Sequence, residues 1–189
     1  IGGQSKALVV YRKWDSNEHK PDLYATLLDT SNPPNTKELK LWDYDDENNP
    51  VEEVIGVRGA YVYDSDTGEG YFIVPLVSGT YVRYDIVLEN HEEVENGPSL
   101  TRRGKHPYAI ALSDIERFAL AYVDEDAGEV KVAIVDPEDI SNPVEFTIES
   151  DPSAMHPLVA YAPLDHSLFY VWSTEGTGHY DVKYAVIDI

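Results

Sequence analysis

Cysteine is absent from the chain, which excludes disulfide bonds and every site built on a thiolate. Methionine occurs once and no apolar run reaches 18 residues, so we expect no insertion into a membrane. Basic residues are also few: 14 Lys and Arg stand against 35 Asp and Glu, for a formal net charge of −21. Because nucleic acids are bound through Lys and Arg that replace counterions, the sequence predicts no nucleic-acid partner.

Catalytic signatures are missing as well. The chain contains neither a Gly-x-Ser-x-Gly nucleophile elbow nor a His-Glu-x-x-His zinc motif. The paired carboxylates of a glycoside hydrolase stay an open alternative among so many acidic residues, although none lies in a recognisable context. The sequence therefore favours a binding or structural module over an enzyme.

The residues that are abundant favour β-strands. Tyrosine occurs 14 times, and short runs rich in Val, Ile, Tyr and Ala are bounded by Gly, Pro, Asn and Asp. No segment holds a helical pattern over three turns. A chain of 189 residues can bury a core without disulfides, so we expect an all-β domain.

An internal repeat organises these strands. The segments His106–Asp114 and Phe118–Val123 return about fifty residues later as His156–Asp165 and Phe169–Trp172. Both copies begin with His-Pro, close the first run with Asp and open the second run with Phe. Weaker copies lie upstream, at residues 7–29 and 71–88. A period of about fifty residues is typical of β-propeller blades.

The repeat predicts a β-propeller-like array of about four antiparallel, four-stranded units within a single domain, residues 1–189. The units cover roughly residues 1–50, 51–104, 105–153 and 154–189. The fourth, outermost strand of the first three units is expected at Leu39–Trp42, Ser99–Arg102 and Val144–Ile148. The first unit begins with its second strand and the last ends with its third. We therefore expect either a piece of a longer propeller or a homo-oligomer that forms through open sheet edges.

The central strand pair of each unit resembles the short repeats of secreted bacterial and archaeal β-propellers. The match rests on Leu8–Trp14 followed by Asp22–Ala25, and on Phe169–Trp172 followed by Asp181–Ala185. The resemblance implies a propeller fold and an extracellular or cell-surface location. A second likeness, carried by Tyr71–Tyr84, is to hemopexin-type repeats, which form four-bladed propellers of about this length.

Three acidic loops are candidate metal sites. Each places two carboxylates two residues apart, the second and third beside a Gly, and calcium prefers hard oxygen ligands from a tight turn. The candidate ligands are Asp43, Asp45, Asp64, Asp66, Asp124 and Asp126. The alternative is that Asp and Gly serve as ordinary hairpin-turn residues. Calcium is the only cofactor that the sequence suggests.

Two pairs of residues at matching repeat positions are candidate ligand contacts. His106 and His156 each precede a Pro, so in a propeller they lie on one rim and could converge. Trp14 and Trp172 occupy matching ends of the second strand and could stack on a sugar or anchor a protein. For both pairs the alternative is structural: strand entry for the histidines and packing between blades for the tryptophans.

The sequence thus predicts a non-catalytic, exported binding or structural module that serves in surface attachment or assembly, with a protein or glycan partner. One alternative is a glycan-active enzyme or its lectin-like accessory domain. Another is the subunit of a self-assembling filament or lattice that is completed by strand exchange.

Overall fold

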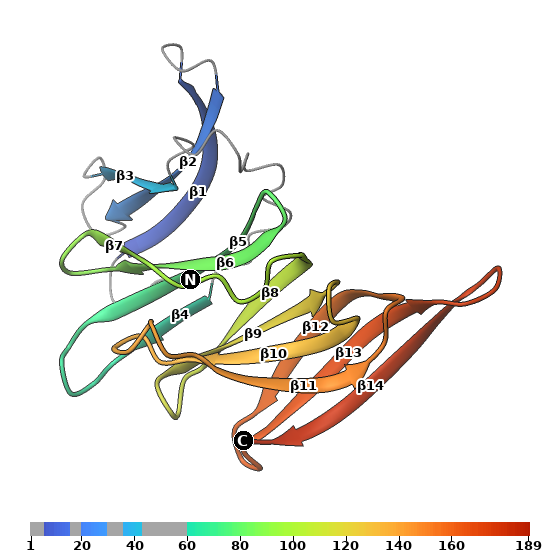
Figure 1. The fold of residues 1–189 in the computed structure, drawn as a ribbon. Helices are drawn as coiled ribbons and strands as arrows, with labels where there is room; N and C mark the ends of the chain where they lie inside the picture. The colour runs from blue at the N-terminus through green and yellow to red at the C-terminus, as the bar shows by residue number, and fades with distance from the viewer. Residues whose placement is uncertain (1–5, 16–19, 30–35, 43–59) are drawn as a thin grey trace.

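The computed structural model describes residues 6–15, 20–29, 36–42 and 60–189, and within them the protein is built of β-strands alone. Across these described residues, fourteen strands form four separate antiparallel sheets that follow one another along the chain and fan out around one edge (Figure 1). The described residues contain no helix long and apolar enough to cross a membrane. The prediction of an all-β, propeller-like array of four units is confirmed.

Each sheet is a meander in which consecutive strands pair. Sheet 1 consists of β1 (Lys6–Asp15), β2 (Lys20–Asp29) and β3 (Thr36–Trp42). Sheet 2 consists of β4 (Ala60–Tyr63), β5 (Gly70–Ser78), β6 (Tyr81–Leu88) and β7 (Glu93–Asn96). Sheet 3 consists of β8 (Gly104–Leu112), β9 (Arg117–Asp124), β10 (Glu129–Val135) and β11 (Val144–Ser150). Sheet 4 consists of β12 (Ala154–Ala162), β13 (Ser167–Glu175) and β14 (Tyr180–Asp188).

One expected strand lies elsewhere. The fourth strand of sheet 2 is Glu93–Asn96, which pairs with β6 from Asp85 to Leu88, and not the expected Ser99–Arg102. Thr101 makes only an isolated bridge to Val82. The physical reason is the turn at Asn90–Glu92: it reverses the chain immediately after β6, so the next residues pair at once.

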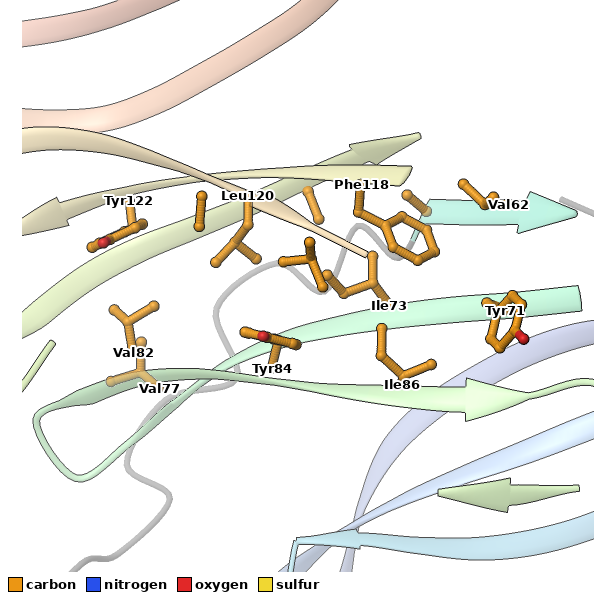
Figure 2. Close-up of a cluster of buried hydrophobic side chains, with 14 residues drawn as sticks. Val62, Tyr71, Ile73, Val77, Val82, Tyr84, Ile86, Phe118, Leu120 and Tyr122 are labelled. Carbon is orange, nitrogen blue, oxygen red and sulfur yellow. The ribbon is translucent and has the colours of Figure 1, made fainter. Parts of the chain in front are cut away.

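The core lies between the sheets, which stack face to face. Between sheets 2 and 3, Tyr71, Ile73 and Ile86 oppose Phe118 and Leu120, all of them buried (Figure 2). The second strands of sheets 2 and 3, β5 and β9, read as near-continuous apolar runs because both of their faces are covered. Separate apolar clusters join sheet 1 to sheet 2 and sheet 3 to sheet 4.

The buried tyrosines also bond the layers to one another. The Tyr84 hydroxyl donates to the carbonyl oxygen of Ile140 at 2.6 Å, and the Tyr170 hydroxyl donates to that of Lys131 at 3.0 Å. Each bond crosses from one sheet to the neighbouring unit. At these two positions tyrosine fills the interface with its ring and satisfies its polar end against backbone, which phenylalanine could not do.

Candidate functional site

The first strands of sheets 2, 3 and 4 lie together at the inner edge of the fan, where β8 contacts both β4 and β12. Along the inner edges of β8 and β12 runs an open cleft of about 590 Å³. Its walls are largely apolar and come from Tyr108, Ile110, Ala111, Val159, Ala160, Tyr161 and Pro163, with Ser113 and Asp114 at one end. An apolar concavity with a few polar groups at one end is the usual form of a ligand site.

The polar end of the cleft is a hydrogen-bonded trio on two adjacent turns. The Tyr161 hydroxyl donates to Asp114 Oδ2 at 2.9 Å and lies 3.1 Å from His166 Nδ1. His166 Nδ1 is in turn 3.4 Å from Asp114 Oδ2. Desolvation and the hydrogen bond to Asp114 raise the pKa of Tyr161, so the phenol stays neutral and a donor. The Tyr161 oxygen can then accept from a protonated His166 Nδ1.

The local sequence explains how these three groups meet. Asp114 belongs to the turn that follows β8, and His166 ends the matching turn that follows β12. His166 has a φ of 48° and Glu116 a φ of 55°, so both turns end in the left-handed conformation that closes a tight hairpin. Two equivalent turns on neighbouring sheets thus present their side chains to one another.

The histidine pair lies at the opposite ends of the same strands, where β8 and β12 begin. The rings of His106 and His156 are in contact, with centroids 4.3 Å apart. Both residues have positive φ, 55° and 51°, and both lie where a bulge shifts the pairing register. Burial, and secondarily the neighbouring His156, lower the pKa of His106 to about 4, so its imidazole is neutral at physiological pH. The expected convergence is present, whereas ligand binding by the pair stays a prediction.

Trp172 is buried at the interface between two sheets. Its side chain is 1% exposed between sheets 3 and 4, and its Nε1 donates to Asp151 Oδ2 at 3.2 Å. This burial favours the packing alternative for Trp172, and ligand contact by its ring stays a prediction. The side chain of Trp14 lies outside the described residues.

Asp151 is the centre of a buried polar network beneath Trp172. Besides the indole, its carboxylate accepts from Thr174 Oγ1 and Lys183 Nζ. Burial opposes ionisation of Asp151, but Lys183 and the hydroxyl and indole donors outweigh it and lower the pKa. The repeat relates Asp151 to Thr101, fifty positions earlier. The matching place in the preceding sheet is therefore the one around Thr101.

In sheet 3 the same network exists with two residue types exchanged. Asp124 stands where sheet 4 has Thr174, Thr101 stands where sheet 4 has Asp151, and Lys131 corresponds to Lys183. Burial opposes ionisation of Asp124, but the hydrogen bonds from the Ala127 backbone, Thr101 and Lys131 outweigh it and lower the pKa. Lys131 Nζ lies 3.2 Å from Asp124 Oδ2. Asp124 is therefore engaged in joining strands.

The proposed calcium loops at Asp64 and Asp124 are closed hairpin turns. Asp64 Oδ1 accepts from the backbone nitrogens of Asp66 and Thr67, and its Oδ2 accepts from the Thr67 hydroxyl. Asp124 Oδ1 accepts in the same way from the nitrogens of Asp126 and Ala127. Nowhere in the described ranges do three His, Asp or Glu side chains gather as a metal cage requires.

Two of the candidate metal ligands, Asp43 and Asp45, lie outside the described residues. Calcium binding thus stays a prediction from the acidic loops.

The cleft itself was not anticipated from the sequence. Asp114, Tyr161 and His166 are spread over two repeat copies, and only Asp114 and His166 fall at positions that the repeat marks as turns. The available signal was their place just after the innermost strand of each unit, where the turns of adjacent propeller blades face one another.

Comparison with known proteins shows the fold alone. No family model matches the chain, and no curated protein matches its sequence. Among solved structures it is similar to a GH43 β-1,3-galactosidase with galactodeoxynojirimycin, at 10% identity and a TM-score of 0.51, over 100% of this chain and 74% of that one. A second GH43 β-1,3-galactosidase gives 10% identity and a TM-score of 0.53 over 100% of this chain.

A third similar structure is an exo-β-1,3-galactanase from Phanerochaete chrysosporium with β-1,3-galactotriose, at 11% identity and a TM-score of 0.50, over 89% of this chain. The chain spans 44% of the second galactosidase and 42% of the galactanase. These likenesses support a propeller-type fold, and they do not support the secreted repeat family that the sequence resembles.

Proposed function

We propose that the chain is a carbohydrate-binding propeller module whose ligand occupies the cleft between β8 and β12. The observation that carries the proposal is the combination of apolar, tyrosine-containing walls with the trio of Asp114, Tyr161 and His166 at one end. The proposal joins the binding module predicted from the sequence to its lectin-like alternative.

The chemistry of the cleft suits a sugar. A pyranose has one face of C–H groups, which packs on apolar and aromatic walls such as those formed by Tyr108, Ile110 and Val159. Its hydroxyl groups donate to carboxylates and accept from imidazole or phenol groups. Asp114 and His166 both stand at the open end, where side chains are partly exposed and a ligand hydroxyl can reach them.

The fold neighbours suggest which sugar to test first. Two of them carry the names of β-1,3-galactosidases and one that of an exo-β-1,3-galactanase solved with β-1,3-galactotriose. A β-1,3-linked galacto-oligosaccharide is therefore the first ligand of choice. An extracellular or cell-surface location belongs to the same proposal, since the sequence resembles secreted propellers.

Binding without turnover is the form of the proposal that the cleft supports. Hydrolysis of a glycosidic bond commonly needs two carboxyl groups, about 5–9.5 Å apart, one on each side of the bond. Of the described residues that line the cleft, Asp114 alone carries a carboxylate, and β4, β8 and β12 contain no Asp or Glu. We therefore favour recognition over cleavage.

Isothermal titration with β-1,3-galactotriose, together with an assay for released galactose, tests the proposal. We expect binding without release, and Asp114→Asn should weaken it about tenfold, since a charge-assisted hydrogen bond becomes a neutral one. The matched control is Asp165→Asn, an exposed carboxylate on the turn after β12 that does not line the cleft. Galactose release would establish the enzyme alternative, and equal affinity of Asp114→Asn and wild type would overturn the proposed site.

A further inference from the structure

The face of sheet 4 that turns away from sheet 3 is apolar and uncovered. Along β14 every second side chain is large, hydrophobic and exposed: Tyr180 at 67%, Val182 at 74%, Tyr184 at 70% and Val186 at 60%. Phe169 on β13 and Leu158 on β12 are about half exposed, at 45% and 48%. Soluble proteins rarely leave so many neighbouring apolar side chains in water unless something binds them.

The pairing register makes these residues one continuous surface. Phe169 pairs with Val186 on one side and with Ala160 on the other, and their side chains therefore point to the same face. Its ring also stacks on that of Tyr184, with centroids 5.7 Å apart. We call this surface, formed by Leu158, Ala160, Phe169, Val171, Val182, Tyr184 and Val186, the sheet 4 outer face.

The repeat identifies what the sheet 4 outer face is suited to bind. Its members correspond, fifty residues on, to the side of sheet 3 that packs against sheet 4: Leu158 to Tyr108, Ala160 to Ile110, Phe169 to Ala119 and Val171 to Ala121. On β14, Tyr184 corresponds likewise to Val132. In sheet 3 this side is covered by sheet 4, whereas the corresponding side of sheet 4 is exposed. A further β-sheet face is the occupant that the internal interface predicts.

Sheet 1 presents the complementary exposed face at the other end of the fan. Its inner side packs on sheet 2, and its outer side carries Val9, Tyr11, Tyr24 and Thr26, which pair across β1 and β2. Tyr11 and Tyr24 stack at 6.2 Å, and Val9 is 45% exposed. In each of the other three described sheets, the corresponding side packs against the sheet that comes before it in the chain. Among the described sheets, only sheet 1 lacks such a neighbour on this side.

Charge favours the contact between these two ends. The strands of sheet 1 carry six Lys and Arg against four Asp and Glu, although the whole chain has a formal net charge of −21. The strands of sheet 4 carry one Lys against three Asp and Glu. A basic first sheet and an acidic last sheet attract one another, whereas two copies of sheet 4 would repel.

We propose that the sheet 4 outer face binds a second copy of this chain, head to tail, through the outer side of its sheet 1. The contact repeats between molecules the stacking that joins sheet 3 to sheet 4 within one molecule. It joins different surfaces of the two copies, so it is heterologous and can propagate into a ring or a filament. It uses sheet faces, in contrast to the open edges considered from the sequence.

Two variants, each blocked on one face, test the contact by light scattering over a range of concentrations. The first is Val182→Asp with Val186→Asp, and the second is Val9→Asp with Thr26→Asp. The three valines are more than 40% exposed, and Thr26 pairs with Val9 on the same outer side, so none of the substitutions enters the core between sheets 1 and 2. The matched control is Val144→Asp, which removes a 54% exposed valine on β11, away from both faces.

We expect the wild type and Val144→Asp to grow in mass with concentration, at least doubling it. Each blocked variant should stay monomeric alone, and an equimolar mixture of the two should form a one-to-one dimer, because each retains the face that the other lacks. A wild type that is monomeric at every concentration overturns the proposal. So does assembly of the Val9→Asp, Thr26→Asp variant alone, which would show a symmetric contact between two copies of sheet 4.

Discussion

Asp85 carries a buried charge whose removal should stabilise the protein at neutral pH. It lies on β6 between sheets 1 and 2, is 1% exposed, and its Oδ1 accepts from Asn96 Nδ2 at 2.9 Å. Its Oδ2 has no hydrogen-bond partner within the described structure. Desolvation by burial raises the pKa of Asp85 from 3.8 to about 7, despite the opposing effects of Asn96 and Arg83.

The direction of the pH dependence follows from that shift. A carboxyl group whose pKa is higher in the folded state favours folding fully only below its unfolded value, near pH 4. This contribution is lost as the pH rises from about 4 to about 7, because the unfolded chain ionises first. Three pKa units correspond to about 4 kcal/mol at most, at about 1.4 kcal/mol per unit.

Asp85→Asn removes the ionisation while keeping the shape and the acceptor for Asn96. The new amide NH₂ lacks a defined acceptor, and this lowers the expected gain in stability by about 1–2 kcal/mol. We therefore expect the free energy of unfolding of the variant to exceed that of the wild type by about 2–3 kcal/mol at pH 8. Near pH 4 this difference should vanish or change sign. Urea unfolding across this range measures it, with Asp126→Asn, an exposed turn carboxylate, as the control. A variant less stable at pH 8, or an offset independent of pH, would refute the reasoning.

Three further substitutions test the packing and the networks. Asp151→Ala should destabilise by about 3 kcal/mol, because it removes the acceptor of the buried Trp172 indole and Thr174 hydroxyl and one of the two carboxylate partners of Lys183. The lowered pKa of Asp151 favours folding above about pH 4, so urea unfolding at pH 7 and pH 3 should show the difference shrinking in acid. Tyr84→Phe removes the bond to the Ile140 carbonyl and should cost about 1–2 kcal/mol at every pH in the same assay, and an unchanged midpoint would contradict the role given to that hydroxyl. Gly97→Ala places a Cβ 2.4 Å from the buried Tyr84 ring, so we expect a lower melting temperature by calorimetry and a loss of about 1–3 kcal/mol, whereas an unaffected protein would show that the ring can move aside.

Much of the fold could be predicted from local pattern. The expected second and third strands of each unit agree with β1 and β2, β5 and β6, β9 and β10, and β13 and β14. The pattern works because alternating side chains and turn residues act over a few neighbouring positions. The same reasoning misplaced the last strand of sheet 2, since β7 is short, charged and mostly exposed and therefore carries almost no hydrophobic signal.

The candidate site could not be predicted to the same extent. The repeat predicted that His106 and His156 would lie near each other, because equivalent positions on adjacent blades share a rim. It gave no indication that Tyr161 would join Asp114 across two sheets, because such a contact depends on how far apart the sheets stack. It also could not distinguish a buried Trp172 from one available to a ligand, since an aromatic at a strand end fits either role.

The sequence by itself determined the strand order, the four-unit repeat, the acidic surface and the absence of thiol chemistry. These properties depend on composition and on interactions between near neighbours. Only the tertiary structure decided which aspartates serve as turn and network residues, that a cleft opens between β8 and β12, and that the outer side of sheet 4 remains uncovered. Those features depend on the stacking of whole sheets, and stacking brings together residues about fifty positions apart whose partnership no local pattern encodes.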